Sequence, residues 1–574
     1  MTDIQIKPRP QSALNTTIPG IPRALAQVLA SRGVQNANGL DYALKRLLPP
    51  KGLSNIDQAA ELLAEAISAD AGIVIVGDFD ADGATSCAVA IKCLRAFGCN
   101  NASYLVPNRF EYGYGLSPEI VGVAAMRQPD LIVTVDNGIS SVDGVHAAQA
   151  LGMSVLVTDH HLPGDEIPTA DVIVNPNLQG DRFASKNLAG VGVIFYVMLA
   201  VRAKLRQMNW FADTGLNEPN MSQFLDLVAL GTVADVVPLD QNNRILVQQG
   251  MQRIRQGQAC AGIRALLSVG NRNPQRLASS DLGFTVGPRL NAAGRLDDMS
   301  VGIECLLAEN EDQAMVLAVQ LDQLNRDRRE VEQSMQQDAL AIVEKLAVDQ
   351  TDVPPIYVLS DEYWHQGVVG LVASRIKERT HRPVVAMAPG DAEGEWKGSA
   401  RSVEGLHIRD LLVRLDATHP NLLAKFGGHA MAAGFSLRTE NLEKFKAALL
   451  LTAQEMTEGR DWSHVLWTDG ELAADEFTME LAEQLRQTTP WGQGFAEPVF
   501  DGQFEVLDAR VVGDTHAKLR LQPVGGEQQI DGICFGYLNS HESLPSGVIR
   551  AAYRLDVNEF RDRLSLQLMI QHIE

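Results

Sequence analysis

The chain has 574 residues, which corresponds to about three or four domains at roughly 150 residues each. Its 71 acidic and 49 basic residues leave a formal charge of −22 at pH 7. That charge argues against a protein that coats nucleic acid through a broad positive surface, but not against an enzyme with a local basic track. Six scattered cysteines, no signal peptide and no apolar run of membrane-spanning length predict a reduced, cytoplasmic enzyme without a membrane partner.

The first half of the chain is typical of a helical preamble followed by an α/β domain. Prolines are frequent before about residue 55, which predicts an irregular helical segment over 1–55. Helical stretches then alternate with short apolar runs near 73–77, 103–106, 131–135, 154–158 and 172–174. This alternation predicts a doubly wound parallel sheet in a domain that spans 56–310.

The second half of the chain predicts three further parts. Residues 311–346 contain no glycine or proline, which favours one long connector helix over 311–350. A second α/β domain is expected over 351–450. Short alternating apolar runs then predict an OB-like β-barrel over 465–574. Residues 467–574 carry 18 acidic and only 8 basic residues, so nucleic acid would contact a narrow stripe or stacking platform there, and docking of a protein is the alternative.

Three of the apolar runs end in acidic residues or histidines. These residues are Asp80 and Asp82 after 73–76, Asp136 after 131–135, and Asp159, His160 and His161 after 155–158. Asp136 alone would fit a turn, but ligands of open α/β sheets bind at the carboxyl ends of parallel strands, so these side chains should converge. Clustered carboxylates repel one another, whereas a hard divalent cation accepts carboxylate and imidazole ligands. The sequence therefore predicts a metal centre.

The spacing of these residues limits how each can reach an ion. Asp80 and Asp82 would point to the same side in extended backbone, so both carboxylates could bind one ion or bridge two. Asp78 fits a strand end or a helix cap better than a third ligand. His160 and His161 are adjacent and would point to opposite sides, so they cannot face one ion in the same manner.

Further motifs extend this pattern along the chain. They are Ala-Leu-Gly-Thr-Val-Ala-Asp-Val-Val-Pro-Leu at 229–239, Gly-Pro-Arg-Leu-Asn-Ala-Ala-Gly-Arg-Leu at 287–296, Trp-His-Gln-Gly-Val-Val-Gly at 364–370, Gly-Ser-Ala-Arg-Ser at 398–402 and Phe-Gly-Gly-His at 426–429. With the Asp-His-His triplet they resemble the DHH phosphoesterase superfamily and, within it, the RecJ family of exonucleases that degrade single-stranded DNA from the 5′ end. The resemblance covers most of residues 70–440.

The resemblance implies which residues form the catalytic metal centre. They are Asp80, Asp82, Asp136, His160, His161 and Asp235. One histidine would coordinate metal directly and the other would contact water or the scissile phosphate, and which does which stays open. Asp226 competes with Asp235, but its place on an apolar run fits a helix face better. The excess of carboxylates and the absence of nearby cysteines favour Mn²⁺ or Mg²⁺, as two ions, over Zn²⁺.

The resemblance also implies a set of substrate contacts. They are Arg109, Arg289, Asn291, Arg295, Ser399, Arg401 and His429. Arginine neutralises phosphate oxygens through forked hydrogen bonds, and Ser399 with Arg401 would suit a 5′-terminal phosphate. Trp364 or Phe110 would stack on bases, with a place in a hydrophobic core as the alternative, because buried aromatic residues are more often core.

These observations predict a single-stranded-DNA-specific 5′–3′ exodeoxyribonuclease that releases 5′-mononucleotides by two-metal hydrolysis. The family implies a role in recombination and mismatch repair, with a single-stranded-DNA-binding protein and a helicase as partners. The alternative is a DHH phosphodiesterase acting on short oligonucleotides or cyclic dinucleotides, which would not need the long extension after about residue 450. A non-catalytic scaffold of the same fold is disfavoured, because every expected carboxylate and both histidines are present.

Overall fold

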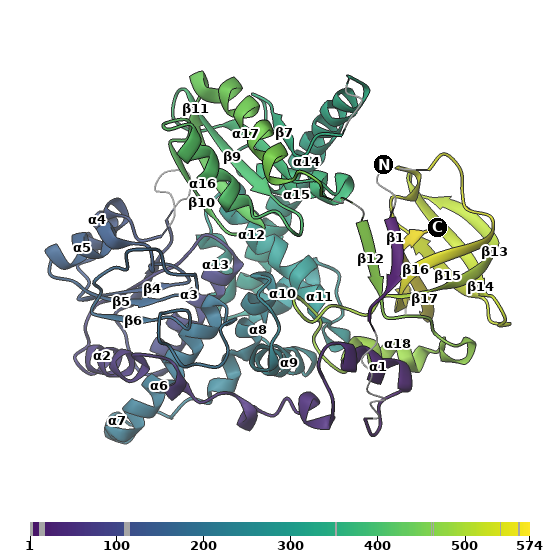
Figure 1. Ribbon diagram of the computed structural model, residues 1–574. Helices are drawn as coiled ribbons and strands as arrows, with labels where there is room; N and C mark the ends of the chain where they lie inside the picture. Colours follow the sequence, from purple (N-terminus) through teal and green to yellow (C-terminus); the bar gives the residue numbers. More distant parts are fainter. Residues whose placement is uncertain are drawn as a thin grey trace. The chain divides into compact units, whose positions relative to one another are not determined.

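The computed structural model describes residues 4–10, 18–107, 115–349, 353–460, 462, 464–539, 541–560 and 563–574 (Figure 1). The chain forms two compact units. The larger unit consists of Ile6–Gly294, Asp298–Asp322 and Leu466–Glu574, and the smaller unit consists of Met1–Gln5, Arg295–Asp297 and Gln323–Val465. Among the helices of the described residues, none is both long and apolar enough to cross a membrane.

The larger unit contains a five-stranded parallel sheet with the order β3-β2-β4-β5-β6. The strands are β2 (Ile73–Val76), β3 (Ala102–Leu105), β4 (Leu131–Val135), β5 (Ser154–Thr158) and β6 (Val172–Val174). Every residue of β2 and β4 is buried, as expected for β-branched strands covered on both faces. The helices that flank the sheet are α2 (Ile56–Ser68), α3 (Ala81–Ala96), α4 (Pro118–Ala125), α5 (Val142–Ala150) and α6 (Gly190–Gln207).

The helices cover both faces of this sheet. Apolar residues of α4 and α5 pack with Val74, Ile132 and Val155 on one face. Helices α2, α3 and α6 contact the strands from the other face. The arrangement confirms the doubly wound parallel sheet that the alternating pattern predicted.

A helical region follows the sheet in the chain. Its elements are α7 (Trp210–Thr214), α8 (Leu225–Ala234), α9 (Gln241–Arg255), α10 (Ala261–Val269), α11 (Ser279–Asp281), the π-helical turn η6 (Leu282–Val286), α12 (Gly287–Leu296) and α13 (Ser300–Leu307). Helix α8 packs against α3, α6 and α9, so the residue that ends α8 is carried toward the sheet. The long helix α14 (Glu311–Asp349) then runs from the larger unit into the smaller one.

The smaller unit holds a second five-stranded sheet with the order β10-β11-β9-β8-β7. Its elements are β7 (Tyr357–Ser360), α15 (Val369–Thr380), β8 (Val384–Pro389), β9 (Glu395–Arg401), α16 (Ile408–Thr418), β10 (Lys425–Gly428), β11 (Ala432–Arg438) and α17 (Leu442–Met456). One face of the sheet packs on α16 and α17 through residues such as Val385 and Phe445. The other face packs on α15 and the second half of α14 through residues such as Val384 and Met335.

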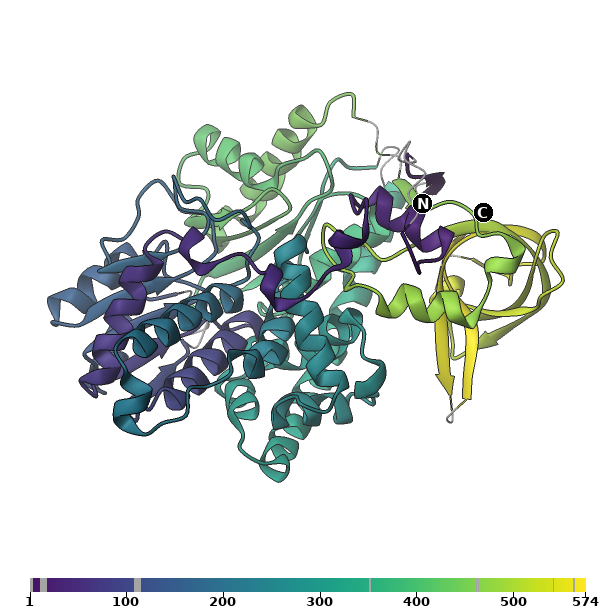
Figure 2. The same cartoon turned by 90° about the horizontal axis from the view of Figure 1, so that it is seen from below.

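The C-terminal part of the larger unit is a closed five-stranded barrel, visible from below in Figure 2. Its strands are β13 (Phe500–Val512), β14 (His516–Pro523), β15 (Ile530–Cys534), β16 (Gly547–Phe560) and β17 (Arg563–Ile573), in the order β13-β14-β15-β17-β16. Only β15 and β17 pair in parallel; the other pairs are antiparallel. The barrel confirms the prediction of an OB-like fold. Helices α1 (Arg23–Ser31) and α18 (Met479–Gln487) belong to the same unit as the barrel, and β1 (Ile4–Pro8) pairs with β12 (His464–Thr468).

Candidate metal centre

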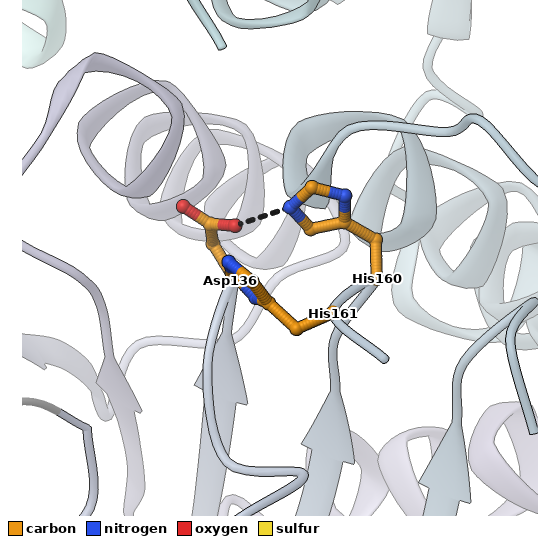
Figure 3. A group of neighbouring side chains, drawn as sticks. All are labelled: Asp136, His160 and His161. Atoms are coloured by element: carbon orange, nitrogen blue, oxygen red, sulfur yellow. Dashed lines mark ion pairs between the residues drawn. The ribbon is translucent and has the colours of Figure 1, made fainter. Parts of the chain in front are cut away.

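The carboxyl ends of β2, β4 and β5 bring the predicted acids and histidines together. The three strands are neighbours, because β4 pairs in parallel with both β2 and β5. Asp136 follows β4 directly, and His160 and His161 follow β5. In Figure 3, the imidazole of His160 points at the Asp136 carboxylate, and His161 lies beside them on the same turn.

The imidazole of His160 lies close to three of the predicted acids. Its Nε2 atom is 3.1 Å from Asp136 Oδ1, 3.5 Å from Asp235 Oδ2 and 4.0 Å from Asp82 Oδ2. Three residue sets each offer ligand atoms that lie within 4.8 Å of one another inside the set. The sets are Asp136, His160 and His161; Asp82, His160 and Asp235; and Asp78, Asp80 and Asp136. Two residues recur between the sets, which suits two cations that share ligands.

Helix α3 begins at Ala81, so the expectation that the backbone stays extended from Asp80 to Asp82 is wrong. Asp80 is the N-cap of α3, and its Oδ1 accepts hydrogen bonds from the N–H groups of Asp82 (2.9 Å) and Gly83 (3.0 Å). Asp82 lies in the first helical turn. Asn291 of α12 supports the same turn, because its Oδ1 accepts a hydrogen bond of 2.7 Å from the N–H of Ala81. Capping therefore orients the Asp80 carboxylate, and the first turn of α3 carries that of Asp82.

The N-terminus of α6 meets the centre from another direction. The two oxygens of Asp82 accept hydrogen bonds from the N–H groups of Gly190 (2.6 Å) and Val191 (2.9 Å). A Cβ on Gly190 would lie 2.5 Å from Asp136 Cβ and 2.6 Å from its Oδ1. Glycine is thus required at 190 for the helix end to approach both acids.

Asp136 itself has an unusual backbone. Its φ of 62° lies in the left-handed region, which a non-glycine residue rarely adopts. The turn is held by Asn137, whose Nδ2 donates hydrogen bonds to the carbonyls of Val76 (3.1 Å) and Val135 (2.9 Å). These bonds tie the ends of β2 and β4 together beneath the centre.

Asp159 organises the turn that carries both histidines. It is 1% exposed, and its Oδ1 accepts hydrogen bonds from the backbone N–H of His160 (2.7 Å) and of His161 (3.1 Å). The same oxygen lies 2.7 Å from His161 Nδ1. A carboxylate at Nδ1 holds the proton on that nitrogen and directs Nε2 of His161 toward a cation. Asn175 and Asn177 complete the turn by donating hydrogen bonds to the carbonyls of His161 and His160.

The centre stores negative charge that a cation would compensate. Burial, together with repulsion from neighbouring carboxylates, raises the pKa of Asp82 and of Asp136 well above the usual range. Burial and the nearby Asp80 raise the pKa of Asp235 to about 7. Burial lowers the pKa of His161, but the bond to Asp159 and the surrounding acids outweigh it and raise this pKa to about 9.

The donor set fits a hard divalent ion. It consists of carboxylate oxygens and imidazole nitrogens, with no cysteine in any of the three sets found among the described residues. Such ligands suit Mn²⁺ or Mg²⁺. The cations would replace the protons that the raised pKa values place on the acids.

Asp235 reaches the centre, whereas Asp226 lies elsewhere. Asp235 follows the last residue of α8 and is the C-cap of that helix. Asp226 is buried in the first turn of α8, where its Oδ2 accepts a hydrogen bond of 2.7 Å from the N–H of Cys260 at the start of α10. The structure therefore places Asp226 in a supporting contact between two helices.

The loop after Asp235 is held by the linker that leads into the barrel. Val236 has a φ of 63°, which a β-branched residue adopts only under strain. The N–H of Leu239 donates to the carbonyl of Gln493 (2.8 Å), and Arg244 Nη1 donates to the carbonyl of Leu239 (2.8 Å). The Arg244 guanidinium lies 4.2 Å from the Phe495 ring centre. The linker thus anchors the loop that begins at Asp235, through the carbonyl of Gln493 and the ring of Phe495.

The predicted substrate contacts of the larger unit have different environments. Arg109 lies outside the described residues. Arg289 is 8% exposed and is held by Asp322 (2.8 Å from Nη2) and by the carbonyl of Thr285, which accepts from its Nη1 (2.6 Å). Asn291 contacts the helix α3 N-terminus at the centre, as described above. The structure therefore places Arg289 in a buried ion pair and only Asn291 beside the acids.

The predicted contacts of the smaller unit include one compact pair. Arg401 Nη1 donates a hydrogen bond of 2.8 Å to Ser399 Oγ. A Cβ on Gly370, in the first turn of α15, would lie 2.9 Å from Arg401 Nη2 and 3.0 Å from Ser399 Oγ. The guanidinium and the hydroxyl therefore lie against a helix N-terminus, a combination that favours anions. Burial lowers the pKa of Arg401.

Two other predicted contacts lie elsewhere in the smaller unit. His429 is exposed in the hairpin between β10 and β11, where its N–H donates to the carbonyl of Ala432 (2.7 Å). Arg295 Nη1 donates to the carbonyl of Gly367 (3.2 Å).

Three residues have roles in the centre that the sequence did not assign to them. Asp78 belongs to one of the ligand sets, Asp159 orients both histidines, and Gly190 admits the α6 N-terminus. The Asp78 and Asp159 positions carried a signal, because each follows a buried strand just as the assigned acids do. Gly190 carried none, because its partners are distant in sequence.

A groove of about 1120 Å³ lies between the barrel and the α10–α11 region of the larger unit. Five basic side chains line it, against three acidic ones: Arg272, Arg276, Arg486, Arg510 and Lys518, with Asp281, Asp556 and Glu559. Phe535, which is 59% exposed, also lines it. The groove lining thus carries more basic than acidic side chains, and Arg272, Arg276, Arg486 and Lys518 form ion pairs with acidic neighbours.

Comparison with known families identifies three segments of the chain. Residues 72–232 match the model of the DHH family, N-terminal domain; residues 351–455 match the DHHA1 domain; and residues 468–572 match the RecJ OB domain.

Characterised proteins and solved structures agree with these matches. The chain is 52% identical to the single-stranded-DNA-specific exonuclease RecJ of Dickeya dadantii, covering 100% of this chain and 99% of that protein. It is 53% identical to the protein of the same name from Escherichia coli, over 96% of both chains. The crystal structure of RecJ from Thermus thermophilus in complex with Mn²⁺ superposes with a TM-score of 0.78 at 29% identity, covering 96% of this chain and 76% of that one. The Mg²⁺ complex of that protein gives a TM-score of 0.73.

Proposed function

Because this chain belongs to the RecJ family of single-stranded-DNA-specific exonucleases, we propose that it degrades single-stranded DNA from the 5′ end at the metal centre described above. The protein is a metal-dependent exonuclease of DNA repair and recombination, and Mn²⁺ or Mg²⁺ is its cofactor. The observation that carries the assignment of the site is the convergence of Asp82, Asp136 and Asp235 on His160, within 3.1–4.0 Å. The whole-length likeness disfavours a phosphodiesterase for short oligonucleotides or cyclic dinucleotides.

The residues of the centre divide into ligands and supports. Asp80, Asp82, Asp136 and Asp235, with His160 and His161, are the ligands that we assign to two ions. When bound, a pair of divalent ions activates water and neutralises the charge that develops on the phosphodiester. Asp159 holds the proton on His161 Nδ1, so that Nε2 faces the cation or the scissile phosphate. Gly190 and Asn291 fix the helix ends that carry or contact the acids.

The arrangement needs no protein nucleophile. The described cysteines are free thiols, and burial raises the pKa of Cys87, the cysteine that packs beside Gly77 at the end of β2. A protonated, buried thiol is inert. Hydrolysis by water, with release of 5′-mononucleotides, is therefore the reaction that we assign.

An assay of end-labelled strands tests this function. A single strand labelled at the 5′ end should lose its label as a mononucleotide in the first turnovers, whereas a 3′-labelled strand should shorten gradually. Both reactions should stop in EDTA and in an Asp136→Asn variant. Early release of the 3′ label, or persistent cleavage by Asp136→Asn, would contradict the proposal.

We assign the Ser399 and Arg401 pair of the smaller unit to the 5′-terminal phosphate. A guanidinium meets a terminal phosphate with two parallel bonds, and each charge-assisted bond contributes roughly 1.5–3 kcal/mol. Arg401→Ala should therefore weaken binding to 5′-phosphorylated strands more than to 5′-hydroxyl strands, when both are measured at one salt concentration. Arg414→Ala, an exposed arginine on α16 that pairs with Glu455, is the matched control. Equal losses on the two strands would assign Arg401 to the internal backbone instead.

The domain division and the partners complete the proposal. We assign 1–55 to an N-terminal preamble, which contains strand β1 as well as the expected helical segments, 56–310 to the DHH catalytic domain, 311–350 to the connector helix, 351–450 to the substrate-binding domain and 465–574 to the barrel. The basic groove beside the barrel is the surface that we assign to the single strand. A single-stranded-DNA-binding protein and a helicase are the proposed protein partners, and the reduced cysteines support a cytoplasmic location.

A further inference from the structure

Phe284 is a large apolar side chain that the fold leaves in water. It is 78% exposed, although its neighbours Thr285 and Val286 are buried. Burying a phenylalanine is one of the stronger contributions that a single residue can make to folding. Trp364, which the sequence suggested as a base-stacking residue, is by contrast buried at 4% exposure in the core against α15, and Phe110 lies outside the described residues.

The segment that carries Phe284 runs along the edge of the metal centre. Phe284 belongs to the π-helical turn η6, which continues into α12. A Cβ on Gly283 would lie 3.3 Å from Val233, and one on Gly287 would lie 3.2 Å from Ala234, the last two residues of α8 before Asp235. Four residues beyond Gly287, Asn291 contacts the turn that carries Asp80 and Asp82.

The positions of these contacts along the chain indicate where the Phe284 ring lies relative to the metal centre. Gly283, Gly287 and Asn291 all approach the acid-bearing segments, and Gly287 and Asn291, four residues apart in α12, share one helical face. Phe284 follows Gly283 by one residue and therefore flanks these contacts. π-Helical turns occur often at functional sites. Val236, the residue after Asp235, is also 61% exposed, which makes the edge of the centre apolar at this point.

Arg272 contacts the residue that follows Phe284, and its Nε also lies 3.4 Å from Asp281 Oδ1. The Nε of Arg272 donates a hydrogen bond of 3.1 Å to Thr285 Oγ1. The Arg272 side chain is 51% exposed and lines the basic groove beside the barrel. The turn that exposes the Phe284 ring therefore also contacts the basic groove through Thr285 and Arg272. Exposed aromatic rings and basic grooves together bind single-stranded nucleic acid, through base stacking and phosphate contact.

We propose that Phe284 stacks on a base of the DNA strand whose 5′ phosphodiester lies at the metal centre. The inference rests on the proposed function, because it requires DNA at that centre. Stacking tolerates every base, since each has a π face, so Phe284 would hold the strand without sequence preference.

The test compares three substitutions at one exposed position. Phe284→Ala should weaken binding of a single strand in EDTA, measured by fluorescence anisotropy, by roughly fivefold or more, and should raise KM in Mn²⁺ by a similar factor. Phe284→Trp should stay within about twofold of the parent protein, and Phe284→Leu should behave like Phe284→Ala, because leucine has no π face. Met126→Ala, at an apolar side chain that is 76% exposed in the same unit, is the matched control and should bind normally.

A strand with an abasic site locates the stacked base. Moving the abasic site through the first few nucleotides should identify one position that weakens binding to the parent protein and has no further effect on Phe284→Ala. Normal DNA binding by Phe284→Ala would overturn the proposal and leave the ring for a protein partner. Equal DNA affinity of Phe284→Leu and Phe284→Trp would also overturn it. So would an abasic site that weakens binding to Phe284→Ala as much as it weakens binding to the parent protein.

The Asp136→Asn variant separates this inference from the function on which it rests. If Asp136→Asn still cleaves DNA, the proposed centre fails. If Asp136→Asn is inactive while Phe284→Ala binds and cleaves like the parent protein, only the stacking role fails.

Discussion

Gly190→Ala should lower the rate of catalysis, because the added methyl group would collide with Asp136. The added Cβ would lie 2.5 Å from Asp136 Cβ, whereas carbon atoms in contact are usually separated by about 3.5–4.0 Å, so α6 or Asp136 must move by about 1 Å. The N–H of Gly190 also donates the 2.6 Å bond to Asp82. A displacement of about 1 Å at a reacting centre costs roughly a hundredfold in rate.

The expected result is a kcat lowered by roughly a hundredfold and a weaker Mn²⁺ affinity, with binding of single-stranded DNA in EDTA nearly unchanged. Metal affinity is measured by calorimetric titration of Mn²⁺ into the metal-free protein, and kcat by mononucleotide release. Gly122→Ala is the matched control, because Gly122 lies in α4 with open space around its Cβ position. Normal kcat and Mn²⁺ affinity in Gly190→Ala would refute the argument that the α6 N-terminus sets the position of the two acids.

Three further outcomes follow from the supports and the charges of the centre. Asp159→Asn should lower Mn²⁺ affinity or kcat by roughly 10–100-fold while the protein stays folded, because the amide no longer holds His161 in its tautomer; unchanged values would remove Asp159 from the centre. Asn291→Ala should lower kcat more than the affinity for DNA, since it frees the N–H of Ala81 at the α3 cap, and a change in DNA affinity alone would assign Asn291 to the substrate instead. In EDTA the melting temperature should fall as pH rises from about 6 to 9. The pKa values of Asp235 (about 7) and His161 (about 9) in the folded protein both exceed their values in the unfolded chain. Stability is therefore lost as each group releases its proton. Mn²⁺ should restore most stability at the alkaline end, and a melting temperature that rises with pH in EDTA would contradict the charge assignment.

The chain order of strands and acids was sufficient to predict the parallel sheet of the larger unit. β-Branched runs at 73–76, 131–135 and 154–158 are buried parallel strands, and their carboxyl ends lie side by side as expected. This prediction is possible because a buried strand needs a local apolar pattern, and parallel strands of one sheet end at the same edge. The five barrel strands were predicted for the same reason, from local alternation and turns.

Local patterns were less informative about how each acid is oriented. The alternation rule predicted that Asp80 and Asp82 share one side of a strand, but Asp80 caps α3 and Asp82 lies in its first turn. The N-cap signal of an aspartate before a helix was present in the sequence, and capping outweighed strand geometry there. Asp226 and Asp235 end up in different places because α8 carries them on opposite ends, which only the helix boundaries reveal.

The sequence by itself determined the elements, the acids and histidines at strand ends, and the family to which the chain belongs, because these depend on short-range patterns and on motif order. The tertiary structure decided which neighbours those residues meet. Gly190 and Asn291 contact the centre from segments more than a hundred residues away from their partners in α3. Arg289 forms a buried ion pair with Asp322, so it is not available to bind phosphate. Such contacts depend on how the helices pack against the sheet. Because the interior is close-packed, shifts of a few tenths of an ångström decide which side chains meet, and no local sequence pattern encodes distances of that size.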